Sequence, residues 1–503
     1  MKKIFSVLLF LVVICQIRAE DTNITTMRKM TQRLFPQQAS FFDFRLLNDT
    51  STDTFTIKSE GNKIIISGNN ANSMAVGLNH YLKNYCLTTI SWYKDDPIEL
   101  PNTLPFISTE VTIKANVPTR FFLNYCTFGY SMTWWKWSDW EHFIDWMALN
   151  GINMPLAITG QEAIWYKVWS KLGLTDEEIR GYFTGPAHLP WHRMCNLDGW
   201  QSPLPKEWLS SQAALQEQIV AREREFNMRP VLPAFAGHVP TALKRVYPNI
   251  KTTRVSEWGG FADQYRCTFL NPMDSLYAII QKEYLTEQTR LYGTNHIYGI
   301  DPFNEIDPPS WDADSLGMMA KHIYESVAAV DPEAVWLQMT WLFYADIKHW
   351  TTPRIKSYLR SVPQDKLILL DYFCEYTEIW KQTDSYFGQP YLWCYLGNFG
   401  GNSFLSGPVK LVSERLADAL KNGGSNLKGV GSTLEGIDLN QFMYEFVLDK
   451  AWNSGQTDKE WFLKLADRRT GKVSPEARKA WEILADKVYI QPAQVGQGTL
   501  TNA

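Results

Sequence analysis

The sequence predicts an α/β protein built around a (β/α)8 barrel of the triosephosphate-isomerase type. Short apolar runs, typical of parallel strands buried on both faces, alternate with stretches of helical periodicity between residues 120 and 450. The main rival is an open doubly wound sheet, but its glycine-rich first turn is not found in this sequence. Eight strands are expected, at Arg120–Cys126, Ile152–Ile158, Arg229–Phe235, His296–Phe303, Ala334–Trp341, Lys366–Phe373, Tyr391–Leu396 and Gly429–Leu434.

Three further segments flank the predicted barrel. Thr54–Lys58 and Lys63–Ser67 alternate apolar and polar residues around a Glu-Gly-Asn turn signal, and helical spacing follows from Ser73 to Cys86, which predicts a small α+β domain. The residues after the barrel have helical periodicity and predict the start of a helical domain. The expected division is a signal peptide at 1–19, the small domain at 20–114, the barrel at 115–453 and a partial helical domain at 454–503.

The predicted signal peptide has a basic start at Met1-Lys-Lys, an apolar run from Ile4 to Cys15 and a small residue, Ala19, at its end. The apolar run is short for a membrane-spanning helix, and we find no other candidate span. We therefore expect an exported protein without a membrane span, periplasmic or secreted if bacterial and lysosomal if eukaryotic. The sequence does not indicate an oligomeric state.

The composition narrows the range of partners. The 503 residues carry a net charge of only -4, which gives no reason to expect a nucleic acid or an anionic membrane surface. The chain has 21 tryptophans, and indole rings suit stacking on sugars, although most of these rings are expected to fill the core.

No cofactor or metal is expected from the sequence motifs. There is no H-E-x-x-H segment, and the eight histidines are scattered without ligand spacing. The cysteines that follow Cys15 show no C-x-x-C spacing. Export permits disulfides, but scattered cysteines on apolar strands are more often buried thiols. These cysteines are Cys86, Cys126, Cys195, Cys267, Cys374 and Cys394.

Two glutamates carry the predicted chemistry. Glu305 follows the fourth expected strand and Glu435 the eighth, and side chains at the carboxyl ends of barrel strands meet at one face. Such a carboxylate pair is typical of glycoside hydrolases, in which one carboxyl protonates the leaving oxygen and the other acts opposite it. Glu305 is the better acid candidate, because the negative charges of Asp301 and Asp307 nearby favour a protonated carboxyl. Glu435, beside Gly436, is the better nucleophile.

Longer motifs resemble glycoside hydrolase family 89, the α-N-acetylglucosaminidases, from the small N-terminal domain to about residue 490. The segments that carry the resemblance are Cys126–Ser131, Trp134–Trp137, Asp145–Asn153, Gly160–Trp165, Phe183–Ala187, Leu232–Pro240, Phe303–Glu305, Asn398–Gly401 and Glu435–Ile437.

The resemblance implies a retaining exo-glycosidase whose partner is a glycan ending in α-linked N-acetylglucosamine. It assigns acid/base work to Glu305 and nucleophilic attack to Glu435, with a glycosyl-enzyme intermediate. It also implies that six residues line the sugar pocket and bind substrate: Asn124, Cys126, Trp191, Trp258, Asn304 and Trp341.

Two alternatives remain open at this point. Family members continue into a large helical C-terminal domain that contributes to the pocket, so the chain is expected to be C-terminally truncated. It would then be an inactive or weakly active glycan-binding fragment. The other alternative is a barrel glycosidase acting on uronic acids, which needs Arg or Lys to hold a carboxylate, whereas the motifs here offer Asn, Cys and Trp.

Overall fold

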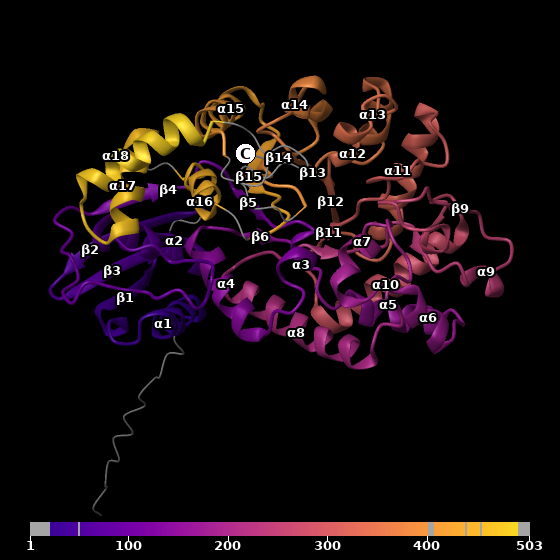
Figure 1. The fold of residues 1–503 in the computed structure, drawn as a ribbon, viewed down its shortest axis with the longest axis horizontal. Coiled ribbons are helices and arrows are strands. Elements are labelled where there is room, and N and C mark those ends of the chain that lie inside the picture. Colours follow the sequence, from indigo (N-terminus) through magenta and orange to yellow (C-terminus); the bar gives the residue numbers. More distant parts are fainter. Residues whose placement is uncertain (1–20, 49–50, 401–406, 438–439, 453–454, 491–503) are drawn as a thin grey trace, which may run out of the picture.

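The fold is taken from a computed structural model of the chain (Figure 1). The predicted signal peptide lies outside the residues that it describes. These residues are 21–48, 51–400, 407–437, 440–452 and 455–490.

An eight-stranded parallel sheet forms the centre of the described structure, in the order β6-β5-β15-β14-β13-β12-β11-β7. Its edge strands meet through a parallel bridge between Leu156 and Val231. The Val231 amide donates to Pro155 O at 2.8 Å, and the Ala157 amide donates to Val231 O at 2.9 Å, so the sheet closes into a barrel. The strands are β5 (Thr119–Phe122), β6 (Met154–Pro155), β7 (Leu232–Pro233), β11 (Ile297–Gly299), β12 (Val335–Met339), β13 (Leu367–Asp371), β14 (Tyr391–Tyr395) and β15 (Leu427–Ser432).

The predicted (β/α)8 barrel is confirmed, and each of the eight expected strands contains or overlaps one observed strand. Most observed strands are shorter than predicted, because apolar sequence continues after the ladder ends. Leu123, for example, is fully buried but has a φ of 87°, which takes the chain out of β5. Burial therefore extends past the strand into the loop that leads to the barrel mouth.

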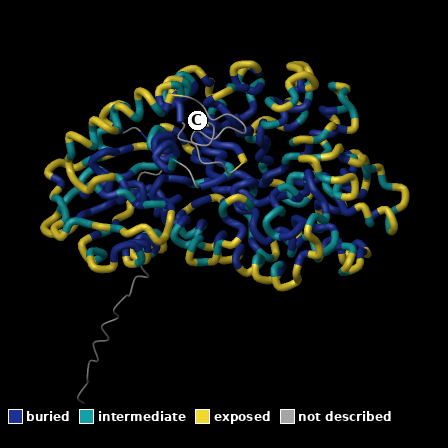
Figure 2. Tube along the Cα trace, in the orientation of Figure 1, coloured by how far each residue is buried: buried dark blue, intermediate teal, exposed yellow. Residues whose placement is uncertain are grey.

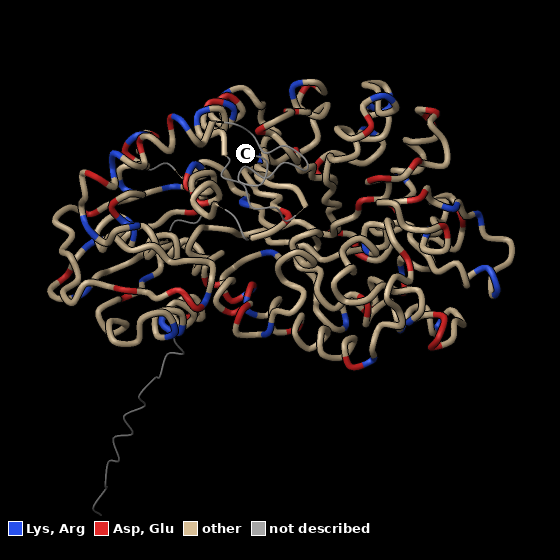
Figure 3. The backbone as a smooth tube through the Cα atoms, viewed as in Figure 1, with Lys and Arg blue, Asp and Glu red and all other residues tan. Residues whose placement is uncertain are grey.

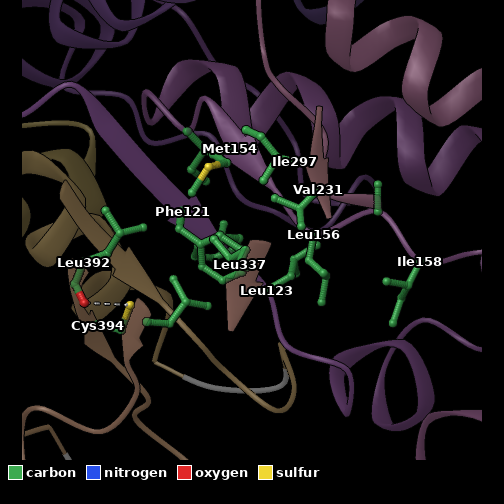
Figure 4. Packing of buried hydrophobic residues seen from close by; sticks show 14 of the residues in the cluster. Phe121, Leu123, Met154, Leu156, Ile158, Val231, Ile297, Leu337, Leu392 and Cys394 are labelled. Atoms are coloured by element: carbon green, nitrogen blue, oxygen red, sulfur yellow. Dashed lines mark hydrogen bonds between the residues drawn. The ribbon is translucent and has the colours of Figure 1, made fainter. Parts of the chain in front are cut away.

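Apolar side chains fill the interior of the barrel (Figure 4). Phe121, Leu156 and Leu337, from three different strand segments, converge there and are at most 2% exposed. Inward-pointing residues of this kind make the centre of a (β/α)8 barrel a packed core rather than a channel, so any ligand has to bind at an end.

Helices surround the barrel, with buried residues toward the centre and exposed residues on the rim (Figure 2). The predicted helix at Ser275–Tyr292 is observed with the same bounds. The helices from the first barrel strand to the end of the barrel are α3 (Thr127–Tyr130), α4 (Trp137–Leu149), α5 (Gln161–Lys171), α6 (Asp176–Tyr182), α7 (Leu189–Arg193), α8 (Lys206–Glu225), α9 (Leu243–Val246), α10 (Ser275–Tyr292), α11 (Ala313–Ala328), α12 (Trp341–Ala345), α13 (Thr352–Arg360), α14 (Ile379–Gln382), α15 (Val409–Asn422) and α16 (Gln441–Asp449).

A small antiparallel sheet projects from the chain between β7 and α10. Its order is β8-β10-β9, with β8 at His238–Val239, β9 at Thr252–Arg254 and β10 at Thr268–Leu270. This sheet supports the long loop that carries Trp258 toward the barrel mouth.

The N-terminal domain is a four-stranded sheet with two helices. Strand order is β1-β3-β2-β4, and β2 and β3 form the predicted hairpin. The elements are α1 (Thr22–Leu34), β1 (Phe42–Leu46), β2 (Thr54–Glu60), β3 (Lys63–Gly68), α2 (Ala71–Tyr81) and β4 (Val111–Lys114).

A fully buried arginine joins this domain to the barrel. Arg120, on β5, donates to Asp53 Oδ2 at 2.6 Å and to Asn72 Oδ1 at 3.2 Å in the N-terminal domain. The same guanidinium donates through Nε to the barrel carbonyl of Gly151 at 2.6 Å. Since a buried cation needs an anion and hydrogen-bond acceptors, both domains contribute to its solvation.

Two helices, α17 (Asp458–Thr470) and α18 (Pro475–Ile483), follow the barrel and lie beside the N-terminal domain (Figure 1). Arg468 of α17 and Lys83 both contact the buried carboxylate of Glu445, at 3.2 and 3.5 Å. Elsewhere acidic and basic residues are interspersed around the periphery (Figure 3). No described helix is long and apolar enough to cross a lipid bilayer.

Candidate active site

A pocket of about 230 Å³ opens at the carboxyl ends of the barrel strands. The loops after β5, β11, β12, β13, β14 and β15 contribute to its lining, together with the segment around α7 and the loop after β9. All eight site residues predicted from the sequence line this one pocket: Asn124, Cys126, Trp191, Trp258, Asn304, Glu305, Trp341 and Glu435.

Glu305 lies on the exposed side of the pocket and is held by hydrogen bonds from three side chains. Its Oε2 accepts from Asn196 Nδ2 and from Trp258 Nε1, both at 2.9 Å, and its Oε1 accepts from Trp341 Nε1 at 3.1 Å. Two predicted sugar-binding tryptophans therefore also orient the predicted acid. Asp301 is half-buried and accepts instead from the Met339 amide at 2.7 Å.

Glu435 lies deeper in the same pocket. Its carboxylate accepts a hydrogen bond from the amide of Gly400, and its own amide donates to Asn398 Oδ1 at 3.1 Å. Burial raises the pKa of Glu435 to about 7; the Gly400 amide opposes this rise and the negative charge of Glu305 adds to it. The two carboxyl groups therefore interact electrostatically, although 130 residues separate them in sequence.

Asn124 and Cys126 form the pocket wall next to Glu435. Asn124 Nδ2 donates both to the Tyr372 hydroxyl and to Thr433 O, while its Oδ1 accepts from the Cys126 amide at 3.1 Å. Both amide hydrogens and one lone pair of Oδ1 are thus used within the protein, so only the second lone pair of Asn124 Oδ1 remains for a ligand. Burial, with the charges of Glu435 and Glu305, holds the pKa of the Cys126 thiol well above its usual range.

Asn304 differs from Asn124 because its carbonyl oxygen is buried without a hydrogen-bond partner among the described residues. An unpaired buried amide oxygen costs free energy that a donor on a ligand would recover. The side chain also lines the pocket beside Glu305. Asn304 is therefore the predicted site residue with the clearest unfilled hydrogen-bonding capacity.

Aromatic rings form the walls of the pocket. Trp191 packs edge-on to Tyr130, with ring centroids 5.1 Å apart, and lies 6.3 Å from Trp258. Across the pocket, Trp341 packs against Tyr372 and Phe399, at 5.7 and 5.9 Å. Flat apolar faces of this kind suit the C–H surface of a sugar ring.

Sequence reasoning missed several residues at the site, of which Asn196 is the most important. It lies three residues beyond the end of α7 and reaches Glu305 only because the long connection between β6 and β7 folds over the barrel mouth. No motif indicates that path. The other residues of the lining that were not predicted are Tyr125, Tyr130, Met194, Asp301, Met339, Tyr372, Phe399 and Gly400.

Comparison with known proteins agrees with this architecture. Residues 120–454 match the model of the alpha-N-acetylglucosaminidase (NAGLU) tim-barrel domain, and residues 25–106 match that of the NAGLU N-terminal domain. The chain belongs to the α-N-acetylglucosaminidase family.

Among relatives of this α-N-acetylglucosaminidase family, the human alpha-N-acetylglucosaminidase is 41% identical over 441 residues, which cover 87% of this chain and 59% of the human protein. A family 89 glycoside hydrolase of Clostridium perfringens, solved with 2-acetamido-1,2-dideoxynojirmycin, has a TM-score of 0.87 and 28% identity over 95% of this chain and 54% of its own. A C. perfringens complex with GlcNAc-α-1,4-galactose has a TM-score of 0.86 and 28% identity, covering 95% of this chain and 53% of its own. The chain thus spans little more than half the length of the relatives it matches.

Proposed function

We propose that this protein is a retaining exo-glycosidase that hydrolyses terminal α-linked N-acetylglucosamine. The observation that carries the proposal is that Glu305 and Glu435 line the same aromatic-walled pocket at the carboxyl end of the barrel. A family relative has been solved with GlcNAc-α-1,4-galactose, which supports the choice of sugar and linkage. The cavity of about 230 Å³ is smaller than the usual 300–1,000 Å³ of ligand sites, which favours a single terminal sugar.

In the proposed first step, Glu305 donates a proton to the glycosidic oxygen and the bond from that oxygen to the anomeric carbon breaks. Glu435 forms a bond to the same carbon through one carboxylate oxygen, giving a glycosyl-enzyme intermediate. In the second step Glu305, now ionised, takes a proton from a water that attacks the anomeric carbon. The bond to Glu435 breaks, and two inversions give net retention.

The stereochemistry of the substrate gives a reason for a protein nucleophile. In a β-linked N-acetylglucosaminide the acetamido oxygen can attack from behind the leaving group. In an α-linked one the acetamido group lies cis to the leaving group and cannot reach that side. A carboxylate of the protein must then attack, and Glu435 is the side chain placed to do so.

The lining of the pocket also argues against the uronic-acid alternative. No Arg or Lys is present among the described residues that line it. A substrate carboxylate would enter a site that already holds Glu305 and Glu435 and would lack a cationic partner, which is strongly unfavourable in a partly buried site. An uncharged sugar fits this environment.

The test is to trap the intermediate with a fluorinated α-N-acetylglucosaminyl donor, which slows release of the sugar from the enzyme, and to map the labelled peptide. We expect the label on Glu435 in the wild-type chain and in Glu283→Gln, a control on α10 that lies outside the pocket and pairs with Lys171, and no label in Glu435→Gln. A label on another residue would refute the assignment. Sugar binding without hydrolysis, unchanged by Glu305→Gln and Glu435→Gln, would instead show a glycan-binding fragment.

A further inference from the structure

Behind the aromatic wall of the pocket, five residues with metal-ligating side chains lie together. Cys195 and Asp198 follow α7, His238 begins β8, and Cys267 directly precedes β10; His192 belongs to α7 itself. The four residues other than His238 are buried, and His238 is nearly so, with its side chain 11% exposed. None of them has a part in the proposed reaction.

The carboxylate of Asp198 is at the centre of this cluster. Its Oδ1 lies 2.7 Å from His238 Nε2, 3.4 Å from Cys267 Sγ and 3.3 Å from His192 Nδ1. The ligand atoms of Cys195, His238 and Cys267 lie within 4.8 Å of one another. The other carboxylate oxygen, Asp198 Oδ2, is buried and has no hydrogen-bond partner among the described residues.

We propose that Cys195, Asp198, His238 and Cys267 bind a zinc ion. Two thiolates, an imidazole and a carboxylate are a ligand set that Zn²⁺ accepts, whereas Mg²⁺ and Ca²⁺ take oxygen ligands. Four protein ligands would close the coordination sphere, which is the property of a structural rather than a catalytic zinc site.

Two of the ligand-to-ligand distances, both from Asp198, can be compared with those of a tetrahedral zinc site. With zinc–sulfur bonds of about 2.3 Å and zinc–nitrogen or zinc–oxygen bonds of about 2.0 Å, tetrahedral ligand atoms lie about 3.3–3.8 Å apart. The distance from Cys267 Sγ to Asp198 Oδ1, 3.4 Å, already falls in this range. The hydrogen bond from His238 to Asp198 must lengthen by about 0.6 Å, which a rotation of the carboxyl group supplies.

His192 acts on the site through Asp198. Its Nδ1 lies near both Asp198 Oδ1 and the carbonyl oxygen of Leu197, at 3.3 and 3.2 Å, so it contacts the carboxylate directly and helps to fix its position. Residues in such positions orient the ligands and are a usual part of zinc sites.

A zinc ion at this location would help to hold one wall of the pocket in place. Asn196, which donates to Glu305, lies between Cys195 and Asp198, and Trp191 lies four residues before Cys195. An ion bound there would tie this segment to β8 and β10, and so fix the wall that carries both residues. Sequence spacing does not reveal the site, because its ligands come from three segments that are distant in the chain.

The experiment measures metal content directly and does not depend on activity. The full chain is produced with zinc in the medium, dialysed, and analysed by mass spectrometry for metals. We expect about one zinc ion per chain in the wild type and in Cys374→Ser, a buried cysteine outside the cluster. Cys267→Ser should lose most of its zinc on dialysis, because even the loss of an orienting residue weakens zinc binding about 10- to 100-fold. His192→Ala, which removes an orienting residue and no ligand, should retain more zinc than Cys267→Ser and less than the wild type.

A second measurement uses the wild-type chain alone, in case Cys267→Ser fails to fold. Cobalt added to the metal-free protein should give the intense near-ultraviolet band of thiolate-to-cobalt charge transfer. The proposal is overturned if the wild type holds no zinc and gives no such band, or if peptide mapping finds Cys195 and Cys267 joined as a disulfide. Retention of full zinc content by a folded Cys267→Ser would also overturn it.

Discussion

Replacing Glu375 by glutamine should stabilise the protein more at pH 8 than at pH 5. Glu375 is fully buried, and its carboxylate accepts from the amides of Leu396 and Gly397, the latter at 2.6 Å. These amides open the loop that carries Asn398 and Gly400 to the proposed nucleophile. Burial raises the pKa of Glu375 from 4.5 to about 7, which outweighs the opposing effect of the amide hydrogen bonds.

The way in which stability changes with pH follows from the direction of this pKa shift. The folded-state pKa is the higher one, so stability from this group is fully present below about 4.5 and is lost as pH rises to about 7. With pKa values of 4.5 and about 7, the loss is about 1 kcal/mol at pH 5 and about 3 kcal/mol at pH 8. Glutamine does not ionise, so Glu375→Gln should escape this loss, gaining about 2 kcal/mol more at pH 8 than at pH 5.

The assay is thermal unfolding of wild type and variant at both pH values. For a chain of 503 residues, about 2 kcal/mol corresponds to a change of about 2 °C in Tm. Glu445→Gln is the matched control. Burial tends to raise the pKa of Glu445, but the charges of Lys83 and Arg468 outweigh burial and lower this pKa to about 2. Glu445 is therefore ionised in the folded protein at both pH values, and Glu445→Gln should change Tm by the same amount at pH 5 and at pH 8. Equal effects of Glu375→Gln at the two pH values would refute the reasoning.

Three further predictions concern the site and the barrel. The kcat/KM for 2,4-dinitrophenyl α-N-acetylglucosaminide, whose leaving group needs no proton from Glu305, should show an acidic limb centred near pH 7, because Glu435 must be ionised to attack; an acidic limb centred below pH 5 would contradict this. Trp258→Phe keeps the ring but loses the 2.9 Å hydrogen bond to Glu305, so steady-state kcat/KM should fall about tenfold, the effect of about 1.4 kcal/mol, and an unchanged value would remove Trp258 from that role. Gly429→Ala would place its Cβ 2.2 Å from a backbone oxygen of β5 and should cost about 3 kcal/mol or more, measured as a fall in Tm, whereas the control Gly181→Ala meets no atom within 4 Å and should leave Tm nearly unchanged.

The barrel was predictable from sequence because its strands are buried on both faces and appear as short apolar runs. The same logic placed Glu305 after the fourth strand and Glu435 after the eighth, as the structure has them. The position of a side chain that directly follows a strand is fixed by the barrel, because the strand determines where the chain leaves the sheet. Asn196 does not, because it lies in a long connection whose path depends on packing between distant segments.

The predicted substrate-binding residues show a related limit. Asn124 and Asn304 are the same residue type in the same pocket, and sequence alone gives them the same role. The structure separates them, since the amide hydrogens of Asn124 are already bonded to Tyr372 and Thr433, while Asn304 Oδ1 has no partner among the described residues. Which hydrogen-bonding groups remain available depends on neighbours from three different loops.

The buried guanidinium of Arg120 couples the stability of the N-terminal domain to that of the barrel. Its counter-ion, Asp53, and its amide acceptor, Asn72, belong to the N-terminal domain, while Arg120 itself belongs to the first barrel strand. A chain shortened to begin at the barrel would leave Arg120 without its counter-ion Asp53 and would expose the apolar barrel surface that the small domain covers. We expect such a shortened protein to be insoluble. The N-terminal domain would then be required for the stability of the barrel and would not be an independent module.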